Sequence, residues 1–263
     1  MPDPGWTVTA SAATVASIAA VADVTMSRAA SGEVAIIVYE RTQGAPQVYG
    51  DSAVAADVLL ERAARVTATP ASTNPKCDNY SYNIGYGQKW VGTFRWYQKS
   101  GISIPYAAIA GGINAMADGT GARSNLQNGA TASYQGTTTV PATFSSSGLC
   151  NSTDLTNVID TGTLPVGWLA GTCTYANASE ISYADVRFNT GRYAWYTGVS
   201  GTGCTAGKFD AQGTMTHEAG HVFGLGHVAN TTLQVMKTNG SECDVAQRLL
   251  GPGDLAGMKA LYP

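Results

Sequence analysis

The chain contains only three histidines, and all of them lie between positions 217 and 227. They are His217, His221 and His227, in a stretch that reads H-E-x-x-H-x-x-G-x-x-H. Imidazole is a common zinc ligand, and this spacing is typical of a zinc site that carries out hydrolysis. The sequence therefore predicts that these three side chains bind one catalytic Zn²⁺ ion.

The spacing also predicts how the side chains reach one ion. His217 and His221 are four positions apart, so on a helix they lie one turn apart on the same face. Glu218 acts in this pattern as a base, taking a proton from the zinc-bound water and passing it to the leaving amine. Gly224 is expected to end the helix, because glycine tolerates the left-handed backbone that turns the chain back to His227.

Three protein ligands leave the fourth position of a tetrahedral zinc open for water, which is the catalytic arrangement. The metal would lower the pKa of that water towards neutrality and polarise the bond to be cut. The alternative is an ordinary helix whose histidines fall at these positions by chance. Because the pattern uses every histidine of the chain, the metal site is the preferred interpretation.

The motif resembles that of the metzincin metallopeptidases, which have a methionine turn beneath the metal. Met236 follows His227 at a plausible distance. The resemblance implies that Met236 forms a hydrophobic floor under the imidazoles. The alternative is an ordinary methionine of the core.

Three further segments, within a resemblance that covers roughly residues 77–263, are similar to the matrixins, the matrix-metalloproteinase branch of the clan. Residues 254–262 are similar to the closing helix D-x-x-G-x-x-x-L-Y, and residues 185–189 to the strand that leads to the zinc helix. Residues 167–170 are similar to the G-x-L-A of the sheet edge above the cleft. The resemblance implies that an extended substrate adds a strand at this edge. Its expected contacts are Trp168, Leu169, Ala170 and Gly171.

The chain departs from these families at three points. Val228 replaces the serine that matrixins usually carry after the third histidine, and no further histidine remains for their structural zinc. Thr238 stands where astacins and serralysins have a metal-facing tyrosine. Transition-state charge would then rest on the zinc, on Glu218 and on backbone donors of the edge strand. Ca²⁺ is a possible second cofactor by resemblance, but no D-x-D-x-D-G loop is present, so no ligand is assigned.

The composition excludes some partners. Charged residues make up 13% of the 263 residues and the net charge is −3, so we expect no nucleic-acid partner. No apolar run is long enough to span a bilayer. The alanine-rich residues 9–24 are no signal peptide as they stand, since they lack a cationic start. We expect a secreted, monomeric protein that acts on a protein or peptide substrate.

The five cysteines form no C-x-x-C pair, so disulfides of an exported protein are the simpler interpretation. We expect the pairs Cys150–Cys173 and Cys204–Cys243. The second pair would tie the loop before the zinc helix to the loop after the methionine turn. Cys77 is then left over, either free, otherwise paired, or acting as a zinc-capping switch within a motif that superficially resembles that of matrixin zymogens.

The amino-terminal third is separated from the rest by the proline-punctuated residues 67–75. Before that linker, residues 33–39 predict a buried strand and residues 51–66 an amphipathic helix. We therefore divide the chain into an N-terminal extension, residues 1–73, and a peptidase domain, residues 74–263. The extension is either a removable propeptide or an integral part of the catalytic domain.

The remaining pattern predicts an α+β fold with a mixed twisted sheet, an early helix, the zinc helix and a C-terminal helix. The early helix is expected at residues 105–118, and its two glycines are expected to allow close packing on the sheet. Residues 128–147 are expected to form a long loop. The expected strands cover residues 80–84, 88–96, 157–160, 168–175 and 181–188.

Three functions fit this pattern. The first is a secreted zinc endopeptidase in which residues 228–243 form the wall of the pocket for the residue after the cut. The second is a zinc-bound adhesion or inhibitory module without proteolytic activity, although its intact Glu218 argues against that hypothesis. The third is a hydrolase that acts on a small amide.

Overall fold

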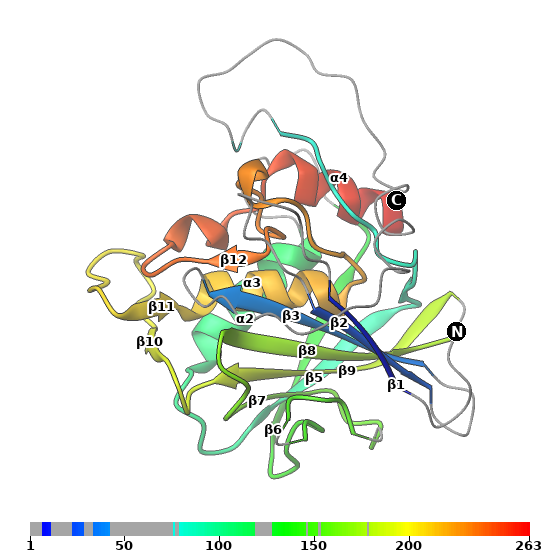
Figure 1. Ribbon diagram of the computed structural model, residues 1–263, viewed down its shortest axis with the longest axis horizontal. Coiled ribbons are helices and arrows are strands. Elements are labelled where there is room, and N and C mark those ends of the chain that lie inside the picture. Colours follow the sequence, from blue (N-terminus) through cyan, green and yellow to red (C-terminus); the bar gives the residue numbers. More distant parts are fainter. Residues whose placement is uncertain are drawn as a thin grey trace.

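The computed structural model describes residues 76, 79–118, 128–145, 147–151, 154–177 and 179–263, together with three N-terminal strands. These parts form a mixed sheet with helices α2 and α3 packed on one face and α4 beyond α3 (Figure 1). The α+β class expected from the sequence agrees with this architecture. Within the described residues, no helix is both long and apolar enough to cross a membrane.

The C-terminal half of the sheet has the order β6-β5-β7-β9-β8. Neighbouring strands are parallel from β6 to β9, whereas β8 runs antiparallel to β9. Every residue of β8 is buried, as expected for a strand covered on both faces. The strands are β5 (Thr93–Lys99), β6 (Thr131–Thr138), β7 (Val158–Gly162), β8 (Trp168–Ala176) and β9 (Glu180–Asn189).

The same sheet continues into the N-terminal part of the chain. Strand β3 (Val34–Thr42) pairs antiparallel with β8, so the strand expected at residues 33–39 is confirmed. Beyond it lie β2 (Asp23–Arg28) and β1 (Thr7–Ser11), each antiparallel to its neighbour. The helix expected at residues 51–66, the linker 67–75 and Cys77 lie outside the described residues.

Two hydrophobic clusters cover the two faces of the sheet. The larger one joins the sheet to α2 (Tyr106–Asp118), α3 (Ala211–Val222) and α4 (Pro252–Leu261). The smaller one lies on the other face and contains Phe144, Tyr175 and Tyr183. The zinc helix is therefore enclosed by the larger cluster.

The two glycines of α2 lie against the zinc helix, not against the sheet as expected. A Cβ atom on Gly112 would be 2.6 Å from Cβ of Met215 and 2.7 Å from the backbone nitrogen of Thr216. A Cβ atom on Gly111 would be 2.9 Å from the side chain of Gln212. The glycines thus allow α2 and α3 to approach closely.

Two other expectations from the sequence were wrong. Residues 80–84 form no strand, because the side chain of Asn83 accepts the amide of Gly85 at 2.9 Å and makes a local turn instead. Residues 128–147 are not one long loop, because β6 lies within them and pairs with β5. Its threonines favour a half-exposed strand at the end of a sheet, a preference that the overall polarity of the segment conceals.

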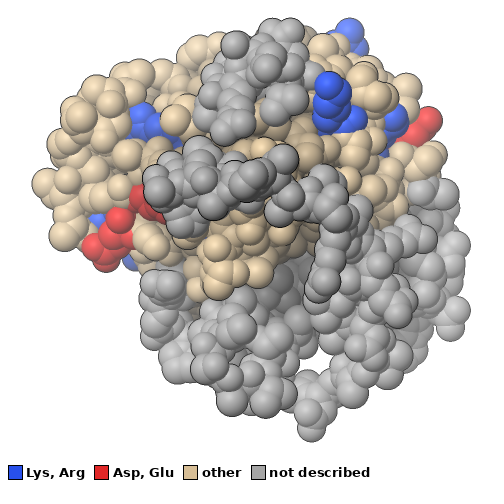
Figure 2. Space-filling view, turned by 90° about the horizontal axis from the view of Figure 1, so that it is seen from above, with Lys and Arg blue, Asp and Glu red and all other residues tan. Residues whose placement is uncertain are grey.

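In the view of Figure 2, charged side chains of the described residues are few and scattered over that face.

Short elements complete the chain. The short elements are β4 (Lys89–Trp90), β10 (Ala194–Tyr196), β11 (Lys208–Asp210), η1 (Asn230–Thr232), β12 (Asn239–Gly240) and η2 (Val245–Arg248).

Candidate metal centre

The zinc helix α3 has well-defined ends. At its start, Oδ1 of Asp210 accepts the amide of Gly213 at 2.6 Å, which satisfies one free donor of the first turn. At its end, Gly224 has a φ of +97°, and a Cβ atom there would be 2.2 Å from the carbonyl oxygen of Gln88. Only glycine fits this turn, so the predicted end of the helix is confirmed.

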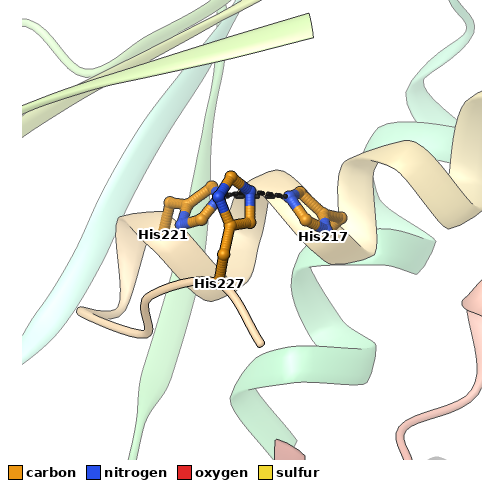
Figure 3. Close-up of side chains that lie close together, drawn as sticks. All are labelled: His217, His221 and His227. Atoms are coloured by element: carbon orange, nitrogen blue, oxygen red, sulfur yellow. Dashed lines mark hydrogen bonds between the residues drawn. The ribbon is translucent and has the colours of Figure 1, made fainter. Parts of the chain in front are cut away.

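The three histidines meet at one point (Figure 3). Nε2 of His217 is 3.0 Å from Nε2 of His221 and 3.1 Å from Nε2 of His227, and the third separation is 3.1 Å. Zinc–nitrogen bonds of 2.0–2.1 Å at tetrahedral angles give nitrogen separations of about 3.3 Å. The geometry of these three atoms therefore suits a tetrahedral metal ion.

The opposite ring nitrogens support the same interpretation. Nδ1 of His217 is 2.7 Å from the carbonyl oxygen of Val235, and Nδ1 of His221 is 2.8 Å from that of Leu225. A carbonyl can only accept, so these Nδ1 atoms carry the protons and the Nε2 lone pairs face one another. Such an arrangement is repulsive unless a cation lies between the lone pairs, which is how metal-binding histidines are commonly oriented.

Burial keeps all three imidazoles neutral. It lowers the pKa of His221 to about 4, and it lowers the pKa of His217 and of His227 well below the usual range. The neighbouring imidazoles lower the last two pKa values further. A neutral imidazole is the form that binds a metal, so the ligands are ready at neutral pH.

Glu218 is fully buried beside the histidines. Burial raises the pKa of its carboxyl group to about 8, while a hydrogen bond from the hydroxyl group of Thr172 to Oε2 lowers it. The other oxygen, Oε1, has no hydrogen-bond partner among the described residues. One oxygen is thus held by Thr172, while the other is buried without a partner in the described part of the chain.

Met236 is buried against the zinc helix. A Cβ atom on Gly220 would be 2.2 Å from the sulfur of Met236, so the thioether packs directly on the helix between the two ligands that the helix carries. The backbone amide of Met236 is held by Asp254 of α4 at 3.1 Å. Met236 thus packs on the helix that carries two of the histidines, and its role as a floor beneath the imidazoles stays a prediction.

The expected substrate edge is not a free edge. Strand β8 contains Trp168, Leu169, Ala170 and Gly171, and it pairs with β9 on one side and with β3 on the other. In this register Gly171 lies opposite Tyr39, and Trp168 lies opposite Arg41. A single strand pattern does not reveal that a segment more than a hundred residues away covers this edge, and substrate binding by these four residues stays a prediction.

Two residues next to the centre, Asn83 and Thr172, were not predicted from the sequence. The side chain of Asn83 donates to the carbonyl oxygen of His227 at 3.1 Å, and the backbone carbonyl oxygen of Asn83 accepts the amide of Gly226 at 2.8 Å. Thr172 contacts Glu218 from β8. No local pattern distinguished either residue, because β8 carries a second threonine, Thr174, two positions after Thr172.

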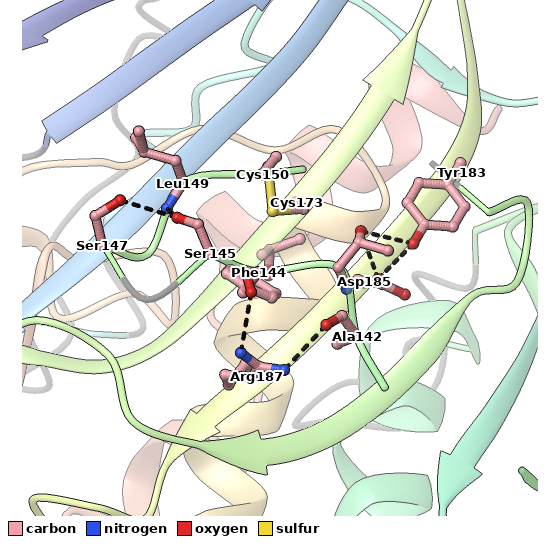
Figure 4. The surroundings of a disulfide bond; sticks show 12 residues. Ala142, Phe144, Ser145, Ser147, Leu149, Cys150, Cys173, Tyr183, Asp185 and Arg187 are labelled. Atoms are coloured by element: carbon pink, nitrogen blue, oxygen red, sulfur yellow. Dashed lines mark hydrogen bonds between the residues drawn. A yellow bond between two sulfur atoms is a disulfide. The ribbon is translucent and has the colours of Figure 1, made fainter. Parts of the chain in front are cut away.

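Two disulfides brace the surroundings, and they are the pairs expected from the sequence. Cys150–Cys173 ties a loop to β8, on the face of the sheet away from the zinc helix (Figure 4). Cys204–Cys243 links the loop before α3 to the loop after Met236.

The loop that carries Cys150 is also held by Arg187 of β9. Its guanidinium group pairs with Asp160 at 2.7 Å and donates to the carbonyl oxygen of Ala142 at 2.9 Å. The loop on this face is thus fixed by the disulfide and by hydrogen bonds of Ala142 to both members of this ion pair.

The ligand set is that of a metal-dependent hydrolase, because three neutral imidazoles and a buried carboxylate share one site. Among the described residues, these three histidines form a group of metal-binding side chains that lie close enough together to hold one ion. Comparison with known families points to the same class. Residues 163–245 match the model of the family Peptidase M66, and this segment contains β8, the zinc helix, all three histidines and Met236.

The match covers about a third of the chain. Together with the three-histidine cluster it supports a metallopeptidase that acts on protein or peptide substrates. No curated protein and no solved structure matches the chain.

Proposed function

We propose that this protein is a secreted zinc endopeptidase with Glu218 as its general base. The observation that carries the proposal is the convergence of three Nε2 atoms beside a fully buried carboxylate. A zinc ion held by the imidazoles would polarise the scissile carbonyl and lower the pKa of the attacking water.

The residues of the chain have separate roles in this proposal. The carbonyl oxygens of Val235 and Leu225 orient two of the imidazoles through their Nδ1 atoms. Burial raises the pKa of Glu218 to about 8, and a zinc ion bound beside it would favour the ionised form. The carboxylate then takes the proton of the attacking water at Oε1, the oxygen without a partner in the described part of the chain, and passes it to the leaving amine. Backbone groups of β8 align the substrate.

We assign the site more closely to the matrixin branch of the metzincins. Support comes from the closing helix, whose Asp254 binds the backbone of the methionine turn. Within the C-terminal half of the sheet, β8 is antiparallel to β9 and follows a run of parallel strands, which supports the same assignment. The two disulfides support secretion. No calcium ligand is assigned, and a monomer is expected.

The test is cleavage of a mixed peptide library with and without 1,10-phenanthroline, read by mass spectrometry. Chelator-sensitive cuts are expected, and a Glu218→Gln variant should bind zinc normally while turnover falls by about 10²- to 10⁴-fold. A variant with undiminished turnover would disprove the role of Glu218. Zinc binding without any cut, in the full chain and after release of its N-terminal part, would favour the adhesion or inhibitory module.

We also propose that residues 1–73 form a propeptide that keeps the enzyme latent. Strand β3 pairs antiparallel with β8 and parallel with β12, so it lies between the expected substrate edge and the segment expected to form the pocket wall. An extended polypeptide in that position competes with any substrate for the backbone groups of β8. This pairing supports a propeptide over an integral extension.

Latency can be tested on the full chain. A specific protease site inserted within residues 67–75 should raise peptidase activity after cleavage. Val38→Pro should raise it without cleavage, because proline cannot donate to the ladder and disfavours the centre of a sheet. Equal activity of the intact, cleaved and proline-containing proteins would show that the strand is an integral part of the enzyme.

A further inference from the structure

The hydroxyl group of Thr172 reaches from β8 to the base on the zinc helix. Thr172 is 1% exposed and lies at the centre of a fully buried strand. Its Oγ1 atom forms a hydrogen bond with Oε2 of Glu218 and lies 3.3 Å from the backbone carbonyl oxygen of the same residue. One short polar side chain thus touches both ends of Glu218.

We infer that Thr172 is a positioning residue that fixes the orientation of the Glu218 carboxylate. A carboxylate rotates readily about its last bond, and in a buried site a hydroxyl donor on one oxygen restricts that rotation. With Oε2 held by Thr172, Oε1 is the oxygen left for the attacking water, and it lacks any partner within the described residues. The inference rests on the proposed function of Glu218 as the base.

The position of Thr172 does not depend on its hydroxyl group. Its backbone is held by the ladder with β9, in which Thr172 lies opposite Val186, and release of β3 leaves this pairing in place. Valine has nearly the same shape and also favours strands, so Thr172→Val removes the donor and leaves the strand in place. Serine keeps the donor and removes only a methyl group.

A purely structural role is the alternative. The single hydroxyl proton can serve the carbonyl oxygen of Glu218 or its carboxylate, but not both at once. Hydrogen bonds to a carboxylate are roughly twice as strong as those to a neutral acceptor, and the carbonyl contact is the longer of the two. The carboxylate is therefore the main acceptor, and loss of the hydroxyl group should impair turnover more than folding.

The experiment compares Thr172→Val and Thr172→Ser with the wild-type full chain after release of its latency. The matched control is Thr174→Val, the same exchange at a buried position two residues along the same strand. For each protein, kcat, KM, zinc affinity and the thermal unfolding temperature of the zinc-bound form are measured on one peptide cut by the wild type.

We expect Thr172→Val to lower kcat by about 10- to 100-fold, the range for residues that orient groups at a metal site. KM, zinc affinity and unfolding temperature should stay near those of Thr174→Val, and Thr172→Ser should recover most of the lost kcat. A Thr172→Val variant with wild-type kcat would overturn the inference and leave the proposed function intact. A Thr172→Val variant that loses zinc affinity in parallel with kcat would have the same two consequences. A wild-type chain without chelator-sensitive cleavage would overturn both.

Discussion

The carboxylate of Asp254 binds the backbone amide of Met236, with Oδ1 3.1 Å from the nitrogen. Its Oδ2 accepts the amides of Val235 at 2.9 Å and Gly251 at 2.8 Å, so one side chain both caps α4 and holds the methionine turn. The carbonyl oxygen of Val235 in turn orients His217. The closing helix is therefore connected to a metal ligand through two hydrogen bonds.

Replacing Asp254 with Asn should destabilise the protein. An amide has one acceptor oxygen and would turn its NH₂ group towards a backbone N–H, so at least one buried donor loses its partner. Such a group costs about 1–3 kcal/mol, and we expect the free energy of unfolding in urea to fall by about 2 kcal/mol. Zinc affinity should fall about 10-fold, because the carbonyl oxygen of Val235 shifts.

The matched control is Lys259→Gln, an exposed position in the same helix. It should change neither the urea midpoint nor the zinc affinity by a measurable amount. If Asp254→Asn matched this control, the methionine turn would be held by the packing of Met236 alone.

Stability without metal should fall in acid. Burial lowers the pKa of His221 to about 4, whereas a histidine in the unfolded chain titrates near 6.5. Below pH 6.5 the unfolded chain therefore binds more protons than the folded chain. The contribution of His221 to the free energy of unfolding is highest near neutral pH and decreases as the pH falls. For His221 alone the loss at pH 5.5 is about 1.4 kcal/mol, and His217 and His227 act in the same direction.

Burial raises the pKa of Glu218 to about 8 and that of Asp185 to about 7, and both groups act in the opposite direction because their neutral forms are favoured as the pH falls. The measurement therefore compares the metal-free Glu218→Gln variant with the same variant carrying His221→Gln, by urea unfolding at pH 7.5 and pH 5.5, so that the contribution of Asp185 cancels. An equal change of stability with pH in the two proteins would mean that His221 is solvated in the folded protein.

The local parts of the site could be predicted from the sequence because their spacing encodes them. The three histidines, Glu218 and the turn at Gly224 depend on neighbouring positions of one helix and loop, and a helix repeats in a known way. The pair Cys204–Cys243 could also be predicted, because its two cysteines lie in the loop before the zinc helix and in the loop after the methionine turn.

The parts that could not be predicted depend on distant segments. Thr172 meets Glu218 across 46 positions, and β3 covers β8 from the far end of the chain. Asn83 lies in a segment that alternates like a strand, yet its side chain forms a turn and supports the loop of His227. Local patterns indicate the type of an element, but tertiary packing decides what lies beside it.

The start of the zinc helix depends on a buried ion pair. Arg248 donates to both carboxylate oxygens of Asp210, at 2.9 and 2.6 Å, and the two side chains are 9% and 2% exposed. Arg248→Met should lower the free energy of unfolding by about 3–5 kcal/mol, because a buried carboxylate loses its partner. Lys237→Met breaks the less buried pair with Asp244 and should cost about 1 kcal/mol or less. Equal losses in urea unfolding would contradict a special role of Asp210.

The two glycines of α2 give a matched pair for testing how tightly the zinc helix is packed. In an ordinary helix, each Gly→Ala exchange would stabilise the protein by about 1 kcal/mol. At Gly111 the new methyl group meets only the flexible end of Gln212, so Gly111→Ala should leave stability unchanged or raise it by up to that amount. At Gly112 the methyl group meets the backbone of Thr216, which cannot move without shifting the adjacent ligand His217.

Gly112→Ala should therefore destabilise the protein by about 1–3 kcal/mol, the usual cost of overpacking, and should weaken zinc binding as well. Urea unfolding of both variants, with and without zinc, measures the two effects. If Gly112→Ala were as stable as Gly111→Ala, α2 would have room to move away from α3. The geometry of the metal centre would then not depend on close contact between these helices.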